Sequence, residues 1–174
     1  FATQALRDDF HLNHFVNTDE IARRLSPDDP NAALMQSGRL MLQEFDRLQD
    51  ERTSFAVETT LSSLSYLRRA QAMQAQGWKC GMVYVWLNSP ELSRERVLAR
   101  VAKGGHDVPE AVIQRRYSRS QNNLINYLNI CDMVYVFDNS GEEPEYVGHG
   151  SVNGFATTLD HDLGYFIHSR LNEA

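Results

Sequence analysis

The chain has 174 residues, of which 42% are hydrophobic and 23% are charged. This composition is typical of a globular protein and excludes collagen, a coiled coil and wholesale disorder. The length fits one domain of about 100–200 residues, and we expect residues 1–174 to form it. The formal net charge of −6 argues against general binding to nucleic acids or anionic membranes.

The apolar runs and the cysteines favour a cytoplasmic protein. The longest apolar runs, 81–87 and 133–137, are too short to cross a bilayer, which takes about 20 residues. No basic and apolar leader opens the chain, so no secretory signal is expected. Cys80 and Cys131 both lie in apolar contexts, and we favour two buried free thiols over a disulfide.

The first half of the chain alternates between helical and strand patterns. The predicted elements are a helix over 1–9, a strand at 14–17, a helix over 19–25, a turn at 26–30, a long amphipathic helix over 31–51, a strand at 54–57 and a helix over 63–76. Asn17 or Thr18 is expected to cap the second helix. Gly77 is expected at the C′ position after the last one, where glycine is favoured.

The second half continues the alternation. The predicted elements are a strand at 80–87, a helix over 90–103, a helix over 109–129, a strand at 133–137, an edge strand at 145–148 and a helix over 160–171. The strand at 80–87 is apolar on both faces, as a buried parallel strand should be.

Repeated strand–helix units predict an α/β fold, in which an open, mostly parallel sheet carries helices on both faces. Ligands in such sheets bind beyond the carboxyl ends of the strands. The polar residues that directly follow each strand are therefore the candidates for a functional site.

Two of these strand ends carry carboxylates. Asp19 follows the strand at 14–17 and could serve as a general base, or it could merely interact with the helix dipole. Glu58, Thr59 and Thr60 follow the strand at 54–57 and offer an acid and two hydroxyls, a set that matches a sugar or another polyol. Alternatively, Thr59 or Thr60 caps the next helix.

Two consecutive helices carry six arginines, which are Arg94, Arg96, Arg100, Arg115, Arg116 and Arg119. Guanidinium groups match phosphate oxygens, and the intervening Gly104-Gly105 could form a hinge that closes them over a nucleotide. The alternative is a solvated surface in which the arginines form salt bridges.

The end of the strand at 133–137 and the remaining motifs are less informative. Asp138 and Asn139 follow this strand and belong to a turn, or present polar groups to a base or ribose. The histidines and cysteines show no metal-ligand spacing, and the chain contains no G-x-x-x-x-G-K-[ST] phosphate-binding loop.

Several stretches together resemble the zeta-toxin-like P-loop kinases. The stretches that carry the resemblance are 16–22, 25–27, 55–61, 104–109, 115–117 and 136–140. The resemblance implies a fold like that of nucleotide kinases and phosphoryl transfer from ATP, with Mg²⁺, to a hydroxyl group. In zeta toxins proper the acceptor is a UDP-linked N-acetyl amino sugar, and an antitoxin protein is an expected partner.

The resemblance also implies roles for individual residues. Asp19 would be the base, Glu58, Thr59 and Thr60 would hold the acceptor, Arg100, Arg115 and Arg116 would stabilise the transferring phosphoryl group, and Asp138 and Asn139 would lie near the adenine. These roles suit phosphoryl transfer, which depends mostly on positioning and charge neutralisation.

The chain departs from the family pattern in two places. The first strand and the Walker A loop of the family precede the position of Phe1, so we expect that the chain is an incomplete record of a longer protein. The missing strand would lie between the strands at 54–57 and 80–87, and both should then lack a neighbour. After Thr60 the chain has Leu61-Ser62-Ser63, whereas zeta toxins proper carry further polar or basic substrate contacts there.

The sequence thus predicts an ATP-dependent kinase that phosphorylates a hydroxyl of a small molecule. The alternative is a catalytically inert domain that binds a nucleotide or a partner and lacks the phosphate-binding loop. Nucleic-acid processing through the arginines is disfavoured by the acidic total and the lack of interleaved aromatic residues.

Overall fold

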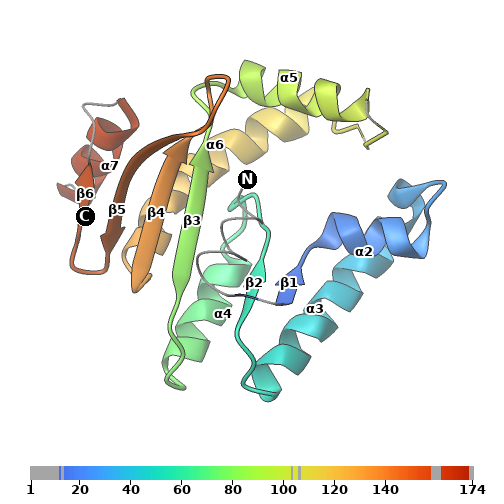
Figure 1. Cartoon of the computed structure of the whole chain (residues 1–174), viewed down its shortest axis with the longest axis horizontal. Coiled ribbons are helices and arrows are strands. Elements are labelled where there is room, and N and C mark those ends of the chain that lie inside the picture. The colour runs from blue at the N-terminus through green and yellow to red at the C-terminus, as the bar shows by residue number, and fades with distance from the viewer. Residues whose placement is uncertain (1–11, 13, 103, 106, 158–161, 173–174) are drawn as a thin grey trace. The chain divides into compact units, whose positions relative to one another are not determined.

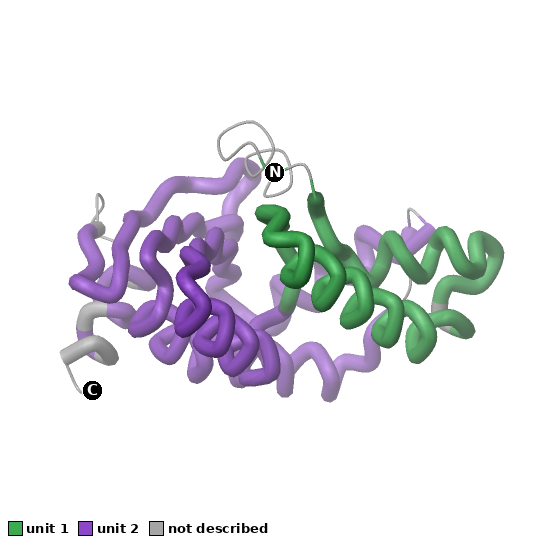
Figure 2. The backbone as a smooth tube through the Cα atoms, turned by 90° about the horizontal axis from the view of Figure 1, so that it is seen from below, with its two compact units in different colours: residues 1–59 green, residues 60–174 purple. Residues whose placement is uncertain are grey.

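The computed structural model describes residue 12 and residues 14–102, 104–105, 107–157 and 162–172. The helix expected over 1–9 lies outside these residues. The chain divides into two compact units, residues 1–59 and residues 60–174 (Figure 2). No helix in the described ranges is long and apolar enough to cross a membrane.

The first unit contains two short parallel strands and two helices. Its elements are β1 (His14–Val16), α2 (Thr18–Leu25), the 3₁₀ turn η1 (Pro30–Ala33), α3 (Leu34–Asp50) and β2 (Phe55–Val57). β1 pairs with β2 in parallel, with His14 opposite Phe55 and Val16 opposite Val57 (Figure 1). Asn17, one of the two predicted candidates, is the N-cap of α2.

The core of the first unit forms along one stripe of α3. Met41, Phe45 and Leu48 recur at helical spacing and are buried. The ring of Phe45 meets that of Phe55 on β2 edge to face, with centroids 4.8 Å apart. Leu34, the first residue of α3, is 41% exposed.

The second unit contains a four-stranded sheet and four helices among the described residues. Its elements are α4 (Ser65–Gln74), β3 (Gly81–Trp86), α5 (Pro90–Val101), α6 (Glu110–Leu128), β4 (Met133–Asp138), β5 (Glu145–Ser151), β6 (Gly154–Thr157) and α7 (Asp162–Asn172). The strand order is β3-β4-β5-β6.

The prediction of a mostly parallel sheet is wrong for this unit. β3 and β4 are parallel, but β4–β5 and β5–β6 are antiparallel. The reason is connection length: β3 and β4 are joined through two helices, whereas only Val152 and Asn153 separate β5 from β6, which permits only a hairpin. β5 was predicted as an edge strand, yet it lies between β4 and β6.

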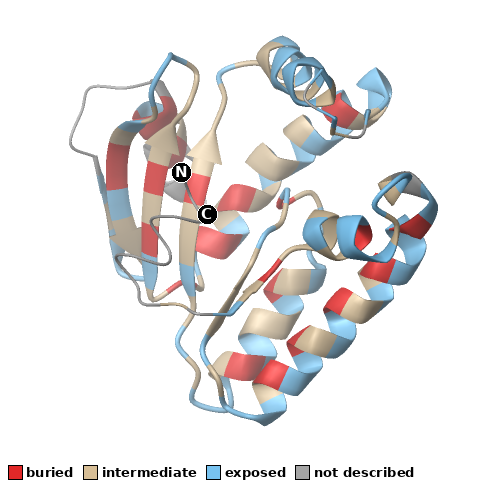
Figure 3. Ribbon diagram, turned by 45° about the vertical axis from the view of Figure 1, so that its right-hand side comes forward, coloured by how far each residue is buried: buried red, intermediate tan, exposed pale blue. Residues whose placement is uncertain are grey.

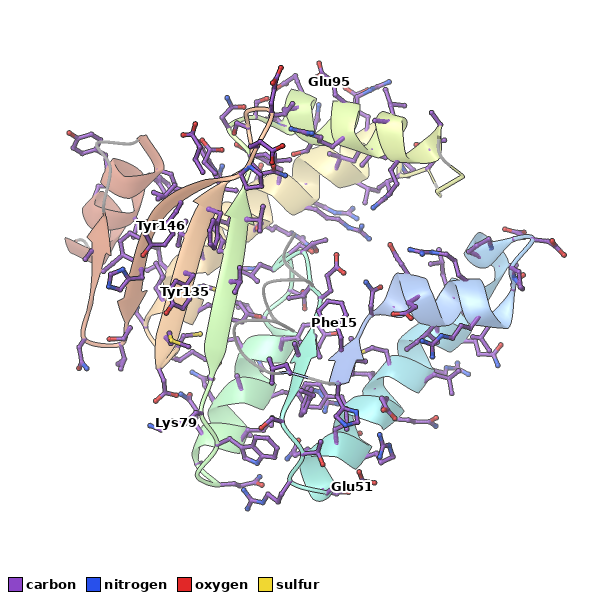
Figure 4. All side chains as sticks on the ribbon, viewed as in Figure 1. Phe15, Glu51, Lys79, Glu95, Tyr135 and Tyr146 are labelled. Carbon is purple, nitrogen blue, oxygen red and sulfur yellow. The ribbon has the colours of Figure 1, made fainter. Side chains whose placement is uncertain are left out.

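Three of the helices described in this unit lie on one face of its sheet. Residues of α4, α6 and α7 pack together with Tyr84, Val134, Val136 and Val147 on one face of the sheet, as the buried positions in Figure 3 illustrate. The opposite face carries half-buried aromatic side chains, including Tyr135 and Tyr146 (Figure 4).

β3 is less buried than its apolar sequence predicts. Only Tyr84 of this strand is buried, and its other residues are half-buried or exposed. Among the described strands, β3 pairs with β4 alone and β2 with β1 alone. An apolar strand with one neighbour keeps one edge and part of its surface accessible, which explains the difference.

Two helices of the second unit end in glycine caps. Gly77 adopts a φ of 86°, and the amides of Gly77 and Trp78 donate to carbonyls of the last turn of α4, as predicted. Gly104 adopts a φ of 88°, its amide donates to the carbonyl of Val101, and that of Gly105 donates to the carbonyl of Arg100, each at 2.9 Å. The Gly104-Gly105 pair, which the sequence suggested as a hinge, therefore forms a Schellman cap on α5.

We expect Gly105→Ala and Gly38→Ala to change stability in opposite directions. A Cβ at position 105 would lie 2.7 Å from Cγ and 3.0 Å from the carbonyl oxygen of Arg100, so the variant should lose about 1–3 kcal/mol. A Cβ at Gly38, inside α3, meets nothing within 4 Å, and alanine there should add about 0.5–1 kcal/mol. Denaturant unfolding followed by circular dichroism measures both, and shifts of the same sign would contradict the packing described.

Candidate functional site

The carboxyl ends of β1 and β2 bring Asn17, Asp19 and Glu58 to one edge of the first unit. The two strands are parallel and in register, so the residues after Val16 and Val57 emerge on the same side. The amide of Glu58 donates to the carbonyl of Val16 at 3.2 Å, which extends the pairing beyond the strands. Asp19 and Glu58, both predicted from sequence, thus lie at the same strand edge.

Asn17 organises this edge through both ends of its side-chain amide. Its Oδ1 accepts from the amides of Asp19 and Glu20, at 2.8 and 3.2 Å, and so caps α2. Its Nδ2 donates to Oε2 of Glu58. A single side chain therefore holds the start of α2 and the Glu58 carboxylate in one arrangement.

The carboxylate of Asp19 is half-buried and has no hydrogen-bond or ion-pair partner among the residues that the structure describes. It lies in the first turn of α2, where the helix dipole favours a negative charge. An unpaired carboxylate in this position is available to accept a proton or a hydrogen bond from a ligand.

Thr59 and Thr60 do not cap the following helix, so this alternative is wrong. α4 begins at Ser65 with Leu64 as its N-cap residue and no side-chain cap. The hydroxyl of Thr60 lies 2.8 Å from that of Ser62. The next residue, Leu61, is buried and has a φ of 55°, a conformation that a leucine rarely adopts.

The carboxyl ends of β3 and β4 form a second polar edge, within the second unit. Asp138 accepts hydrogen bonds from the amide and the hydroxyl of Ser140. The amide of Asn88, after β3, donates to the same hydroxyl at 2.9 Å, and the amide of Asn139 donates to the carbonyl of Trp86 at 2.9 Å. The predicted pair Asp138 and Asn139 therefore lies in a turn that is bonded to the neighbouring strand end.

The six arginines fall into two groups. Arg94 forms an ion pair with Glu110 and so joins α5 to α6. Arg96 donates to the carbonyls of Asn139 and Gly141, at 3.2 and 2.8 Å, and so joins α5 to the turn after β4. These two arginines have structural partners.

The remaining four arginines are exposed and have no partner within the described ranges. They are Arg100 at the end of α5 and Arg115, Arg116 and Arg119 on α6. Free guanidinium groups on an acidic protein are suited to an anion such as a phosphate. The three arginines favoured from the sequence belong to this group.

Sequence reasoning missed the residues that position the others. Tyr117 donates from its hydroxyl to the carbonyl of Leu87 at 3.0 Å and fixes α6 to the end of β3. Asn17, Ser140 and Arg96 hold strand ends and turns together. The position of Asn17 before a helix was visible as a cap signal, but its bond to Glu58 joins residues 41 positions apart and left no local signal.

No group of three or more histidine, cysteine, aspartate or glutamate residues is placed to hold a metal ion in the part of the chain that the structure describes.

Comparisons with known proteins identify the family. The family model described as zeta toxin matches residues 8–147, which include both strand edges and the arginines of α5 and α6. The chain belongs to the zeta toxin family, a kinase-related family. An uncharacterized protein of Haemophilus influenzae is 29% identical over 102 residues, which cover 59% of this chain and 73% of that protein. No solved structure matches the chain significantly.

We expect Asn17→Ala to be less stable than Asn17→Asp, and both to be less stable than the wild type. The alanine variant loses the cap of α2, worth about 1 kcal/mol, and the bond to Glu58. The aspartate variant keeps an acceptor for the cap but loses the donor to Glu58. Thermal unfolding followed by circular dichroism ranks the three proteins. Equal losses of stability in both variants would contradict the cap role. An Asn17→Asp variant as stable as the wild type would contradict the bond to Glu58.

Proposed function

We propose that the protein is an ATP-dependent phosphotransferase that phosphorylates a hydroxyl group of a small molecule. The observation that carries this proposal is the edge formed by Asn17, Asp19 and Glu58, which lies inside the region that matches the zeta toxin family. A free carboxylate next to a second, anchored carboxylate suits an acceptor that must be held by one hydroxyl and deprotonated at another.

In this proposal the residues that follow β1 and β2 hold the acceptor. Asp19 accepts the proton of the attacking hydroxyl, because its carboxylate has no other partner in the described part of the chain. Glu58 binds a further hydroxyl of the acceptor, and its orientation is set by Asn17. Thr59 and Thr60 add hydroxyls directly after Glu58, and they are not used as a helix cap.

The strained backbone at Leu61 supports a role for this segment. A leucine at a φ of 55° persists only when its surroundings hold it, and such outliers are frequent at functional sites. Here the side chain is buried in the core, and Nδ2 of Asn123 donates to the Leu61 carbonyl at 2.7 Å. The left-handed backbone conformation of Leu61 lies directly after Thr60.

The arginines of α5 and α6 are proposed to supply the positive charge that phosphoryl transfer requires. Arg100, Arg115 and Arg116 are exposed and unpaired among the described residues, so their guanidinium groups fit the phosphates of a nucleotide. ATP, when bound, supplies the transferred phosphoryl group. Asp138 and Asn139 lie in the turn after β4 and are proposed to lie near the adenine.

No residue is assigned to the Mg²⁺ ion that the family implies, and among the described residues no group of three or more histidine, cysteine, aspartate or glutamate residues is placed to hold a metal ion. The proposed roles of the carboxylates and arginines do not depend on that ion. As further parts of the proposal, the acceptor is a UDP-linked N-acetyl amino sugar, an antitoxin protein is a partner, residues 1–174 act as one kinase domain, and the protein acts in the cytoplasm.

We expect Asp19→Ala to lower acceptor-dependent ADP formation by about 10²–10⁴-fold, because a general base contributes about that much. The assay uses the full-length protein, ATP and a panel of hydroxyl acceptors that includes UDP-N-acetyl sugars. Glu20→Ala is the matched control, because Glu20 is the next residue, is exposed and pairs only with Arg24 in the described structure. Normal turnover in the Asp19 variant would remove this residue from the mechanism.

We expect Arg116→Ala to lower the single-turnover rate by about 10²–10³-fold, the effect of losing one group that stabilises charge in the transition state. Arg68→Ala is the control, since Arg68 is an exposed arginine on α4 and its loss changes the net charge equally. If both variants reacted at the same rate as the wild type, Arg116 would have no part in phosphoryl transfer.

A further inference from the structure

The sulfur atoms of Cys80 and Cys131 lie 3.4 Å apart in the second unit. Cys80 directly precedes β3 and is half-buried, whereas Cys131 lies shortly before β4 and is fully buried. Both are free thiols. They lie at the amino ends of the two parallel strands, the end of the sheet that the labelled Lys79 marks in Figure 4.

The backbone around the two cysteines is held in place from several sides. The amide of Asp132 donates to the carbonyl of Cys80 at 2.8 Å, and the amide of Cys80 donates to the Asp132 carboxylate at 2.9 Å. The same carboxylate accepts from Lys79 Nζ at 2.7 Å. The amide of Val152 donates to the carbonyl of Cys131 at 2.9 Å. The two thiols are therefore held in contact by pairing that does not involve the sulfur atoms.

We propose that Cys80 and Cys131 are a redox-active thiol pair, which a peroxide converts into a reversible intramolecular disulfide. Closing the gap from 3.4 Å to a bond of about 2.05 Å requires side-chain rotation and little backbone movement. This inference is independent of the proposed phosphotransferase activity.

Oxidation of the two thiols to a disulfide proceeds in two steps. The Cys80 thiolate attacks hydrogen peroxide, one oxygen is transferred to sulfur, and the other leaves as water after protonation, which yields Cys80 sulfenic acid. The Cys131 thiol then attacks this sulfur, loses its proton and displaces the hydroxyl as a second molecule of water. A dithiol reductant restores both thiols.

The environment favours Cys80 as the residue that reacts first. The hydrogen bond with the Cys131 thiol lowers the Cys80 pKa, although burial and the Asp132 carboxylate oppose this. The hydrogen bond to Cys80 and burial both raise the pKa of Cys131. Cys80 is also the more exposed of the two, so a peroxide can reach it.

The disulfide would close a covalent loop from residue 80 to residue 131, which includes all of α5 and α6. These helices carry Arg100, Arg115 and Arg116, while the bond itself lies at the opposite ends of β3 and β4 from the turn at Asp138. Oxidation should therefore stabilise the second unit against unfolding without occupying the polar edge.

Treatment of the full chain with hydrogen peroxide tests the proposal. We expect loss of two hydrogen atoms in the intact mass, loss of both titratable thiols and a cross-linked peptide that contains Cys80 and Cys131 after non-reducing digestion. The oxidised protein should unfold at a temperature on the order of 10 °C higher than the reduced one, and a dithiol should reverse every change.

Two variants make the test specific. In Cys131→Ala, we expect Cys80 to accumulate sulfenic acid, detected by a dimedone adduct, and the thermal shift to be absent. In Cys80→Ser, we expect the buried Cys131 to resist peroxide. Two thiols that stay free under peroxide, or oxidation of Cys80 to sulfinic acid in the wild type without a disulfide, would overturn the proposal.

Discussion

Neighbouring parallel strands end at the same edge of a sheet, and this constraint determines where the chemistry of this protein can lie. It places the residues after β1 and β2 together, where Asn17 donates to Glu58 and caps the helix that carries Asp19. It also places the residues after β3 and β4 together, where Ser140 links Asn88 to Asp138. In each unit a short polar side chain holds a carboxylate at the strand edge: Asn17 holds Glu58, and Ser140 holds Asp138.

The charged residues at these edges and on α5 and α6 differ in whether they have partners. Arg94, Arg96 and Asp132 connect elements of the second unit and have defined partners. Asp19, Arg100, Arg115 and Arg116 have none among the described residues. Charged side chains left free beside well-fixed ones can bind an ionic ligand without first breaking an internal bond, which lowers the cost of binding. This contrast separates the proposed functional residues from the structural ones.

Local signals predicted most helices and strands, because these elements begin and end at residues with strong preferences. Asn17 before α2 and Gly77 after α4 marked the limits of their helices. The strand β6 was missed, since Gly154–Thr157 is short and its pairing depends on a two-residue hairpin. Exposure of β3 was also missed, because burial depends on neighbouring strands and not on the apolar sequence of the strand itself.

The candidate site was predictable only in part for the same reason. Strand ends pointed to Asp19, Glu58 and Asp138, since polar residues after apolar strands are visible in the sequence. The bonds that orient these groups connect distant positions, such as Asn17 with Glu58 and Asn88 with Ser140, and no local pattern encodes them. Likewise, the pattern of six arginines did not show that Arg94 and Arg96 have structural partners, because those partners lie on distant segments.

The identity of the product tests the central claim most directly. ³¹P nuclear magnetic resonance of the full-length protein with ATP and a hydroxyl acceptor follows every phosphorus atom at once. The account predicts that a phosphate monoester of the acceptor appears in step with ADP. Unchanged ATP across all acceptors, or release of inorganic phosphate alone, would contradict it.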